Sequence, residues 1–295
     1  MPPTDAPRTL GGILAVATTF LAERKAPEPR LAAEWLAARL LKCGRLDLRL
    51  RLDQTLPESL VEAMRRGVKR VAAGEPVQYV IGRWEFRGHP FVVDRRALIP
   101  RPETEQLVQL VLDDRTLWKM PEPRIVDIGT GSGCIAVSLA KERPQGRYLA
   151  TDISEEALAL AKENATLNGV AERILFAPGD LADILEPATA DAIVSNPPYI
   201  PSAVVDQLAP IVRDFEPRLA LDGGEDGLDI LRQIAEDATL ALRNGGRLFF
   251  ELSAEQCQAE TLGKYLQDLG FVEIQAQRDL SGAERFLCAT LAEGV

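Results

Sequence analysis

The chain has 295 residues, of which 46% are hydrophobic and 26% charged, and its formal net charge is −10. These values are ordinary for a folded protein of one large or two unequal domains. The negative charge argues against general binding to nucleic acid, which needs a basic surface to neutralise phosphates. No apolar run approaches the ~20 residues of a membrane span. We therefore expect a cytoplasmic protein, monomeric, with no membrane or direct nucleic-acid partner.

The charge is distributed unevenly along the chain. Residues 1–85 contain 14 Lys and Arg against 10 Asp and Glu, a net charge of +4. The remaining residues contain 20 basic and 34 acidic side chains, a net charge of −14. The less acidic N-terminal part is therefore a candidate surface for a partner.

Three amphipathic helices are predicted in this N-terminal part. Apolar side chains recur at helical spacing over residues 10–22, 29–42 and 57–74. Their apolar faces contain no reactive side chain. We therefore predict a small helical bundle over residues 1–74 that serves as a substrate-docking domain, with a purely structural cap as the alternative.

The stretch over residues 75–103 is predicted to be a β-hairpin linker. Two runs rich in β-branched and aromatic residues lie at 77–82 and 84–93, with a turn near 87–90. A proline-rich stretch follows and stiffens the chain ahead of a helix predicted over 105–112. This stiffness is expected to fix how the small domain joins the large one.

Strands and helices alternate from Arg124 to the end of the chain. The predicted strands cover 124–128, 147–151, 173–177, 190–195, 246–252, 271–276 and 285–291. The predicted helices between them cover 133–142, 154–167, 227–242 and 255–269. This alternation predicts an α/β fold, a doubly wound sheet, as the core of a large domain over residues 104–295.

A glycine-rich turn joins the first of these strands to the following helix. Gly129, Gly131 and Gly133, with Thr130 and Ser132 between them, let the backbone approach a ligand closely. The spacing G-x-G-x-G is tighter than the dinucleotide fingerprint, so a phosphate contact is not required. Such a turn is shared with dehydrogenases and does not identify the ligand by itself.

Three acidic residues stand at the ends of predicted strands. Asp127 precedes the glycine turn, where it can accept from an ammonium group. Asp152, followed by Ile153, ends the second strand, where a carboxylate can hold both ribose hydroxyls. Asp180, followed by Leu181, is placed to meet an adenine amine. With the glycine turn, this constellation resembles class I S-adenosylmethionine-dependent methyltransferases, which implies a Rossmann-like sheet whose last strand is reversed.

The sequence Asn196-Pro197-Pro198-Tyr199 follows a predicted buried strand. An amide nitrogen is a poor nucleophile, and its two N–H groups need two acceptors to orient it. The side-chain oxygen of Asn196 and the carbonyl of Pro197 can supply both, and Tyr199 can stack on a planar group. Catalysis is then mainly placement plus polarisation. The motif alone leaves open whether the acceptor is an adenine, a guanine or a glutamine.

Several segments taken together resemble the PrmC/HemK family of peptide chain release factor N5-glutamine methyltransferases. They are Ile99–Glu105, Asp127–Gly133, Asn196–Ile200, Arg213–Leu221 and Gly223–Leu228. The resemblance implies methylation of the glutamine in the Gly-Gly-Gln loop of class 1 release factors, with S-adenosylmethionine as the cofactor. It further implies that Phe86, Arg101 and Glu103 wall the glutamine channel and that the Arg213–Leu219 segment buttresses it.

The resemblance also places the cofactor against Gly129–Gly133, Asp152, Leu181 and Asn196. The Leu181 position is often aromatic in this family, so a leucine there supplies only dispersion contact.

Two alternatives remain, a ribosomal-protein glutamine methyltransferase and a nucleic-acid amino-methyltransferase. No metal site is predicted. The cysteines show no paired spacing and are expected to be free thiols, buried at Cys134, Cys257 and Cys288.

Overall fold

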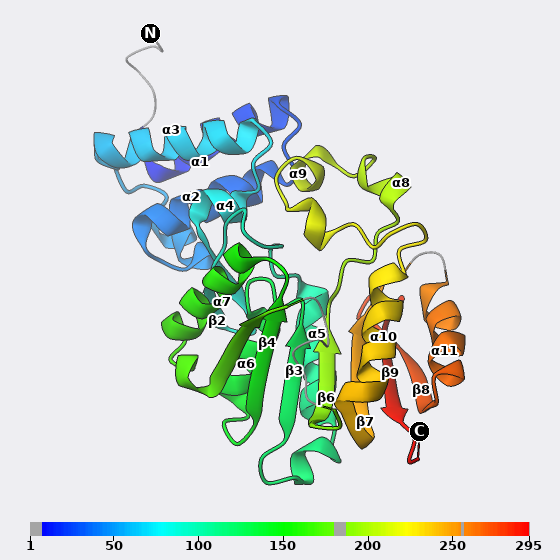
Figure 1. Cartoon of the computed structure of the whole chain (residues 1–295). Helices are drawn as coiled ribbons and strands as arrows, with labels where there is room; N and C mark the ends of the chain where they lie inside the picture. The colour runs from blue at the N-terminus through cyan, green and yellow to red at the C-terminus, as the bar shows by residue number, and fades with distance from the viewer. Residues whose placement is uncertain (1–7, 180–186, 255–256, 295) are drawn as a thin grey trace. The chain divides into compact units, whose positions relative to one another are not determined.

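The computed structural model describes residues 8–179, 187–254 and 257–294. Contacts divide the chain into two compact units. The first comprises the described residues of Met1–Arg83 and Ala209–Phe215, and the second those of Trp84–Leu208 and Glu216–Val295. Figure 1 shows helices in the first unit and a large sheet in the second. Asp180 and Leu181 lie outside the described residues.

The first unit is helical and contains the three helices predicted in the N-terminal part of the chain. Its elements are α1 (Leu10–Glu23), α2 (Pro29–Leu41), the 3-10 helix η1 (Arg45–Arg51), α3 (Glu58–Ala72), α4 (Val77–Ile81) and α9 (Pro210–Arg213). The hydroxyl of Thr9 caps α1 by accepting from the backbone N–H of Gly12 at 3.3 Å. Side chains at helical spacing, such as Leu10, Ala17 and Leu21, are buried in the bundle core. The 3.6-residue period of the sequence thus decides which faces pack together.

The strand expected over residues 77–82 is wrong, because these residues form the short helix α4. Gly82 ends the helix in the left-handed conformation, with a φ of 73°. Val77, Val80 and Ile81 pack against the bundle core. Their spacing of three and four residues presents one face of a helix, whereas a strand presents every second residue. Packing therefore outweighs the β-propensity of this run.

A hairpin with its turn in the predicted region 87–90 is confirmed, but both of its strands, β1 (Arg83–Phe86) and β2 (His89–Val92), follow the run 77–82. Its two-residue turn has positive φ at both positions, 50° at Arg87 and 71° at Gly88. This conformation matches the twist of antiparallel strands. Phe86 is buried and meets Phe91 edge to face, with the ring centroids 5.9 Å apart. The hairpin is thus fixed by its own aromatic pair.

The seven predicted strands form one sheet in the order β5-β4-β3-β6-β7-β9-β8. They are β3 (Arg124–Ile128), β4 (Arg147–Asp152), β5 (Ile174–Pro178), β6 (Ala190–Ser195), β7 (Leu242–Glu251), β8 (Phe271–Arg278) and β9 (Glu284–Leu291). The first five pair in parallel, and β9 runs antiparallel between β7 and β8, which confirms the reversed strand. The chain order changes direction between the neighbours β3 and β6. Ligands of such sheets bind at the carboxyl ends of the strands at this switch point.

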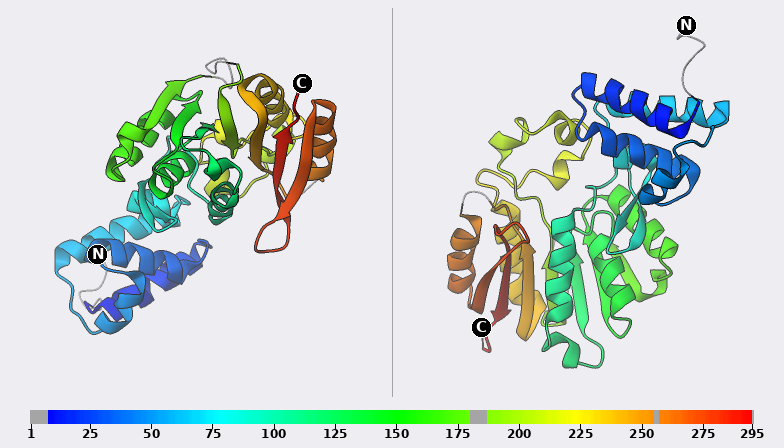
Figure 2. Two further views of the ribbon diagram at one scale, coloured as in Figure 1. Left: turned by 90° about the horizontal axis from the view of Figure 1, so that it is seen from below. Right: turned by 180° about the vertical axis from the view of Figure 1, so that it is seen from behind.

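Helices cover both faces of the sheet, as Figures 1 and 2 show. The longer ones are α5 (Pro102–Asp113), α6 (Cys134–Glu142), α7 (Glu155–Leu167), α10 (Asp229–Ala241) and α11 (Gln258–Asp268). The shorter ones are η2 (Leu117–Lys119), η3 (Ala171–Arg173), α8 (Ser202–Val205) and η5 (Arg218–Ala220). Helices α10 and α11 share an apolar core with β3, β6, β7 and β9. The predicted doubly wound α/β fold is confirmed.

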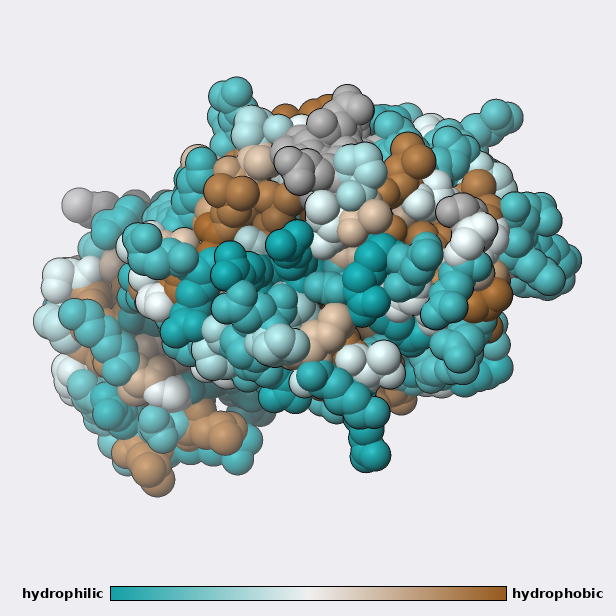
Figure 3. Space-filling view, turned by 60° about the horizontal axis from the view of Figure 1, so that its bottom comes forward, coloured by the Kyte–Doolittle hydropathy of each residue, from teal (hydrophilic) through white to brown (hydrophobic). Residues whose placement is uncertain are grey.

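The helices show no membrane-spanning segment in the described part of the chain. Within the described ranges, no helix has both the length and the apolar character needed to cross a bilayer. The face of the molecule in Figure 3 is mostly hydrophilic, with smaller hydrophobic areas between the hydrophilic ones.

All four cysteines are free, and Cys134 and Cys288 are buried, whereas Cys257 is exposed. The expectation that Cys257 is buried is wrong, because Cys257 immediately precedes α11 at its N-cap position and does not lie on the packed face.

Candidate active site

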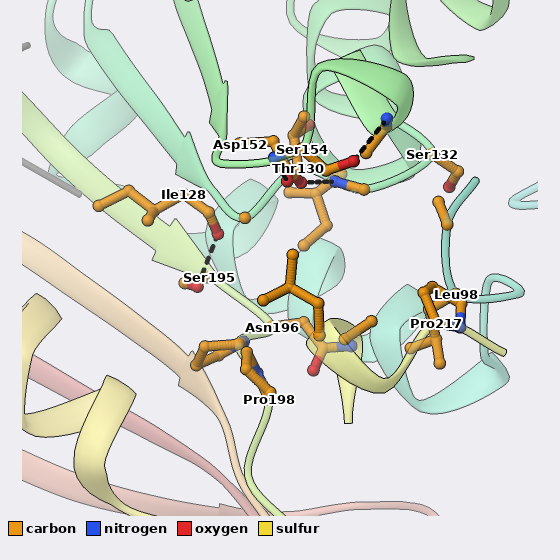
Figure 4. A pocket seen from close by; sticks show the side chains of 18 of the residues that line it. Leu98, Ile128, Thr130, Ser132, Asp152, Ser154, Ser195, Asn196, Pro198 and Pro217 are labelled. Carbon is orange, nitrogen blue, oxygen red and sulfur yellow. Dashed lines mark hydrogen bonds between the residues drawn. The ribbon is translucent and has the colours of Figure 1, made fainter. Parts of the chain in front are cut away.

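A cavity of about 270 Å³ lies at the carboxyl ends of β3 and β6 (Figure 4). Ten of the predicted site residues line it, namely Arg101, Gly129, Thr130, Gly131, Ser132, Asp152, Ile153, Asn196, Pro197 and Pro198. Five other predicted residues are described but do not line it, namely Phe86, Glu103, Asp127, Gly133 and Tyr199. The fold thus brings the glycine turn, the acid after β4 and the Asn-Pro-Pro segment to one cavity.

The glycine turn is held in shape by its neighbours in the sheet. The backbone N–H of Thr130 donates to the carbonyl of Thr151 at 2.9 Å. Gly129 and Gly131 have φ values of 67° and 56°, which other residues rarely adopt. A Cβ placed on Gly129 would meet no atom within 4 Å and would occupy open space. The turn therefore leaves room for a ligand against its backbone.

Asp127 lies behind the turn. Its Oδ2 accepts from the Thr130 hydroxyl at 2.6 Å and from the backbone N–H of Ala136 at 3.1 Å. Its Oδ1 is buried with no hydrogen-bond partner in the described part of the chain. Burial raises the pKa of Asp127 to about 7. Asp127 therefore joins the turn to the start of α6.

Asp152 ends β4 and faces the cavity. Its Oδ2 accepts from the backbone N–H of Gly131 at 2.8 Å, and its Oδ1 accepts from that of Ser154 at 2.9 Å. Burial raises the pKa of Asp152 above its ordinary value, although both hydrogen bonds favour the charged form. A carboxylate oxygen can accept more than one hydrogen bond. Asp152 is therefore fixed by the backbone and can still accept from two hydroxyl groups.

Asn164 supports the site from α7, and sequence reasoning missed it. Its Nδ2 donates to the carbonyls of Ser132 at 2.9 Å and Val92 at 3.1 Å. Its Oδ1 accepts from the backbone N–H of Val92 at 2.6 Å. The signal was a carboxamide among the apolar positions of a predicted amphipathic helix. One fully buried side chain thus joins the glycine turn to the β-hairpin.

Gly133 is required for packing, and we expect Gly133→Ala to lower the free energy of unfolding by about 2–3 kcal/mol. Its φ is 80°, and an added Cβ would lie 3.0 Å from the Cβ of Ala161 in α7. Gly169→Ala is the matched control, because Gly169 has a φ of 72° but no atom within 4 Å of an added Cβ. Strain alone costs about 1 kcal/mol there. Equal losses in urea denaturation of the two variants would contradict the packing role.

Asn196 belongs to a chain of hydrogen bonds that ends at a buried carboxylate. Its Nδ2 donates to the Thr104 hydroxyl at 3.0 Å, and that hydroxyl donates to Oε2 of Glu251 at 2.8 Å. The Tyr199 hydroxyl lies 3.4 Å from Oε1 of Glu251 and donates to it. Burial raises the pKa of Glu251 to about 7 and raises that of Tyr199 above its ordinary value.

Sequence reasoning assigned no role to Glu251, and it included Thr104 only as part of the Ile99–Glu105 segment. The available signal was a carboxylate in the apolar run that ends β7, at the same sheet edge as Asn196.

Arg101 makes an ion pair with a buried carboxylate at the cavity wall. Its Nη2 lies 2.5 Å from Oε1 of Glu216, whose side chain is 2% exposed. Oε2 of Glu216 accepts from the backbone N–H of Ile99 at 3.4 Å. Pro217 and Leu219, just beyond Glu216, also line the cavity. Glu216 therefore joins the segment around Arg101 to the segment that follows it on the wall.

The residues present fit S-adenosylmethionine. The backbone at Gly129 borders open space, which suits close approach of a ligand. Asp152 offers a fixed carboxylate, which suits the two hydroxyls of a ribose. Ile153 lines the cavity with 56% of its surface exposed, which gives a purine ring an apolar contact.

Comparisons with solved structures agree with this fold. The hMettl16 catalytic domain, solved in complex with the MAT2A 3′UTR hairpin 6, matches with a TM-score of 0.56 and 19% identity. The match covers 75% of this chain and 81% of that one. A methyltransferase from Pyrococcus furiosus matches with a TM-score of 0.51 and 18% identity, over 70% of this chain and 91% of that one. At such identities these likenesses establish the fold alone, that of S-adenosylmethionine-dependent methyltransferases.

Comparisons of sequence are more specific. The family described as "PrmC N-terminal domain" matches residues 13–82, and the "Methyltransferase small domain" matches residues 106–215. The protein named "Release factor glutamine methyltransferase" from Rhodopirellula baltica is 40% identical over 287 residues, 96% of each chain. Its namesake from Chlorobaculum tepidum is 41% identical over 285 residues, 93% of this chain and 95% of that one. Because these matches span nearly the full length of both chains, this chain belongs to the release factor glutamine methyltransferase family.

Proposed function

We propose that this chain transfers the methyl group of S-adenosylmethionine to the side-chain amide of the glutamine in the Gly-Gly-Gln loop of class 1 peptide chain release factors. Membership of the family supports the substrate class. The observation that carries the proposal is that Asn196 and Pro197 line the same cavity as the glycine turn and Asp152. A site for an amide and a site for a nucleoside therefore adjoin within one unit of the chain.

The cofactor would lie between the glycine turn and Asp152. When bound, it supplies a methyl group on a positively charged sulfur. Asp152 accepts from the ribose hydroxyls, and the backbone of Gly129 and Gly131 gives the ligand room. Asp180 and Leu181 remain predicted contacts of the adenine, and Ile153 gives its ring an apolar surface.

Asn196 and Pro197 orient the target nitrogen. Oδ1 of Asn196 accepts from one N–H of the glutamine amide, and the carbonyl of Pro197 accepts from the other. With both hydrogens held, the nitrogen lone pair points along one fixed direction. Placement of this kind contributes most of the rate enhancement when no strong base is needed. The proton leaves for solvent after transfer, so the chain needs no group that removes it beforehand.

The channel for the glutamine would be built around Arg101. The Arg101–Glu216 ion pair fixes this wall, because loss of Arg101 would leave the buried Glu216 carboxylate without its ion-pair partner. Pro198 also lines the cavity, whereas Tyr199, Phe86 and Glu103 do not line it and remain predicted contacts of the glutamine. We assign the docking of the release factor itself to the less acidic helical bundle of residues 1–74.

A label-transfer assay tests the proposal. Tritium from methyl-labelled S-adenosylmethionine is expected to appear in recombinant release factor only when the enzyme is present. Replacing the loop glutamine by asparagine in the release factor should abolish this transfer, because the shortened amide no longer reaches Asn196. Transfer to ribosomal protein or to nucleic acid, with none to the release factor, would refute the proposal.

A further inference from the structure

Thr104 and Glu251 form a hydrogen-bonded pair next to Asn196; Thr104 lines the cavity and Glu251 does not. The side chain of Thr104 comes from the first turn of α5, and Glu251 is the last residue of β7. Their residues are 2% and 1% exposed. Burying a carboxylate costs free energy unless something compensates it. No Lys or Arg in the described part of the chain forms an ion pair with Glu251, so its presence calls for a functional reason.

The sheet itself brings Glu251 to Asn196. Strands β6 and β7 pair in parallel with Ser195 opposite Phe250, so Asn196 comes level with Glu251 at the carboxyl edge. Thr104 lies between their side chains, 3.0 Å from Nδ2 of Asn196 and 2.8 Å from Oε2 of Glu251. Three elements that are distant in the sequence therefore meet in one hydrogen-bonded chain.

The hydrogen bonds from Asn196 through Thr104 to Glu251 all point in one direction. A hydroxyl carries one proton, and the Thr104 hydroxyl donates it to the Glu251 carboxylate, which can only accept when ionised. The Thr104 oxygen can then only accept from Asn196, so the group of Asn196 that faces Thr104 must be its NH₂. The carbonyl oxygen Oδ1 consequently faces away from Thr104. No described residue donates to this Oδ1, which leaves it available for the substrate.

We propose that Thr104 and Glu251 are positioning residues that fix which end of the Asn196 carboxamide is presented to the glutamine. This inference rests on the proposed function, in which Oδ1 of Asn196 accepts from the glutamine amide. An ionised Glu251 makes Thr104 a donor, and Thr104 in turn holds the NH₂ of Asn196. Without these hydrogen bonds, the carboxamide of Asn196 can rotate by half a turn. It then offers its NH₂ to the glutamine, where it repels the N–H groups of the amide.

Protonation of Glu251 would reverse the direction of the hydrogen bonds that join Glu251, Thr104 and Asn196. A carboxylic acid can donate to Thr104, and Thr104 can then donate to Oδ1 of Asn196, which turns the acceptor away from the substrate. The charged or titratable groups that face Glu251 are Glu103 of α5, Arg285 of β9, Tyr199 after β6 and Cys134 of α6. Glu103 disfavours the ionised form of Glu251, whereas Arg285 and the Tyr199 hydroxyl favour it. Because burial raises its pKa to about 7, the reversal falls within a range that assays can cover.

We expect Thr104→Val to lower kcat for release factor methylation about tenfold, with KM and cofactor affinity changed by less than about threefold. Valine has the shape of threonine but offers no hydrogen bond. Thr104→Ser should restore most of the activity, because serine keeps the hydroxyl. Ser138→Ala is the matched control for loss of a buried hydroxyl, since Ser138 in α6 is fully buried and its hydroxyl has no hydrogen-bond partner in the described ranges. Full activity of Thr104→Val, or no rescue by serine, would overturn the inference.

Glu251→Gln tests the charge. The wild-type kcat is expected to fall as the pH drops below about 7, because Glu251 gains a proton there and the hydrogen bonds through Thr104 to Asn196 reverse. Glu251→Gln should show about tenfold lower kcat at pH 8 and no such acid limb. An acid limb that persists in the variant would assign it to another group, such as Asp127, and would contradict the inference.

Stability distinguishes this role from a structural one. The native pKa of Glu251 lies above its ordinary value of 4.5, so native protein binds the proton more tightly than unfolded protein between pH 4.5 and about 7. Stability from this group is therefore present at low pH and lost as the pH rises through that range. We expect Glu251→Gln to have a higher Tm than wild type at pH 8, despite its lower activity. A lower Tm accompanied by lost activity would mark Glu251 as structural.

The same assays separate two failures. If wild-type enzyme does not methylate the release factor, the proposed function fails, whatever the variants do. If the wild type methylates it and Thr104→Val and Glu251→Gln do so equally well, only the positioning inference fails.

Discussion

Asn196→Ala is expected to lower release factor methylation by about 10²–10³-fold while the Kd for S-adenosylmethionine changes by less than about tenfold. The alanine removes the acceptor that orients the glutamine amide, so the nitrogen lone pair is no longer directed. The cofactor contacts assigned to Asp152 and the glycine turn remain in place. Single-turnover methylation and calorimetric titration of the cofactor measure the two quantities separately.

Asn244→Ala is the matched control for this variant. Asn244 is exposed and lies near the start of β7, at the end of the sheet away from the cavity. The same substitution there should change neither quantity. A large loss of cofactor affinity in Asn196→Ala, with turnover nearly intact at saturating cofactor, would show that Asn196 acts on the cofactor and not on the glutamine.

Asp152→Ala is expected to weaken cofactor binding about 100-fold, which is about 2.7 kcal/mol. Two effects contribute to this loss. The ribose hydroxyls lose their acceptor. The backbone N–H of Gly131 also loses its 2.8 Å hydrogen bond to Oδ2 of Asp152, which holds the glycine turn. Cofactor titration followed by tryptophan fluorescence or calorimetry gives the change directly.

Glu156→Ala serves as the control for charge, because Glu156 is an exposed carboxylate four residues further along. It should leave the Kd unchanged. If both variants weaken binding equally, the effect comes from the general field of the acidic surface, and the assignment of Asp152 to the ribose is wrong.

The fold was predictable because its elements have strong local signals. The strands of the large sheet are short apolar runs bounded by Gly, Pro or charged residues, as in Ile125–Ile128 before the glycine turn. The run over 77–82 shows where that logic fails. Its β-branched residues predict a strand, but Val77, Val80 and Ile81 form helix α4, where they pack on the bundle core.

The part of the site that binds ligands was also predictable, since its residues follow strands in the sequence. Gly129, Asp152 and Asn196 each come directly after a strand, or at its end, and therefore meet at one edge. Asp127 was named as a contact for an ammonium group, and that assignment stays a prediction. In the structure its Oδ2 serves the turn, and only its buried Oδ1 is without a partner in the described ranges.

The supporting residues were not predictable, because their partners are far away in the sequence. Thr104 and Glu251 are separated by 147 positions, and Thr104 and Asn196 by 92. Asn164 likewise reaches across 72 positions to Val92. A local pattern cannot show such pairs, although Thr104, Asn164 and Glu251 are each a polar group at a buried position.

The most direct test of the account is to find the methyl group by mass spectrometry. Recombinant class 1 release factor is incubated with the enzyme and S-adenosylmethionine, digested and fragmented, with Asn196→Ala run in parallel. We predict one added methyl group on the side chain of the glutamine in the Gly-Gly-Gln loop, present with wild-type enzyme and greatly reduced with the variant. An unmodified loop glutamine with wild-type enzyme, or a methyl group on another residue, would contradict it.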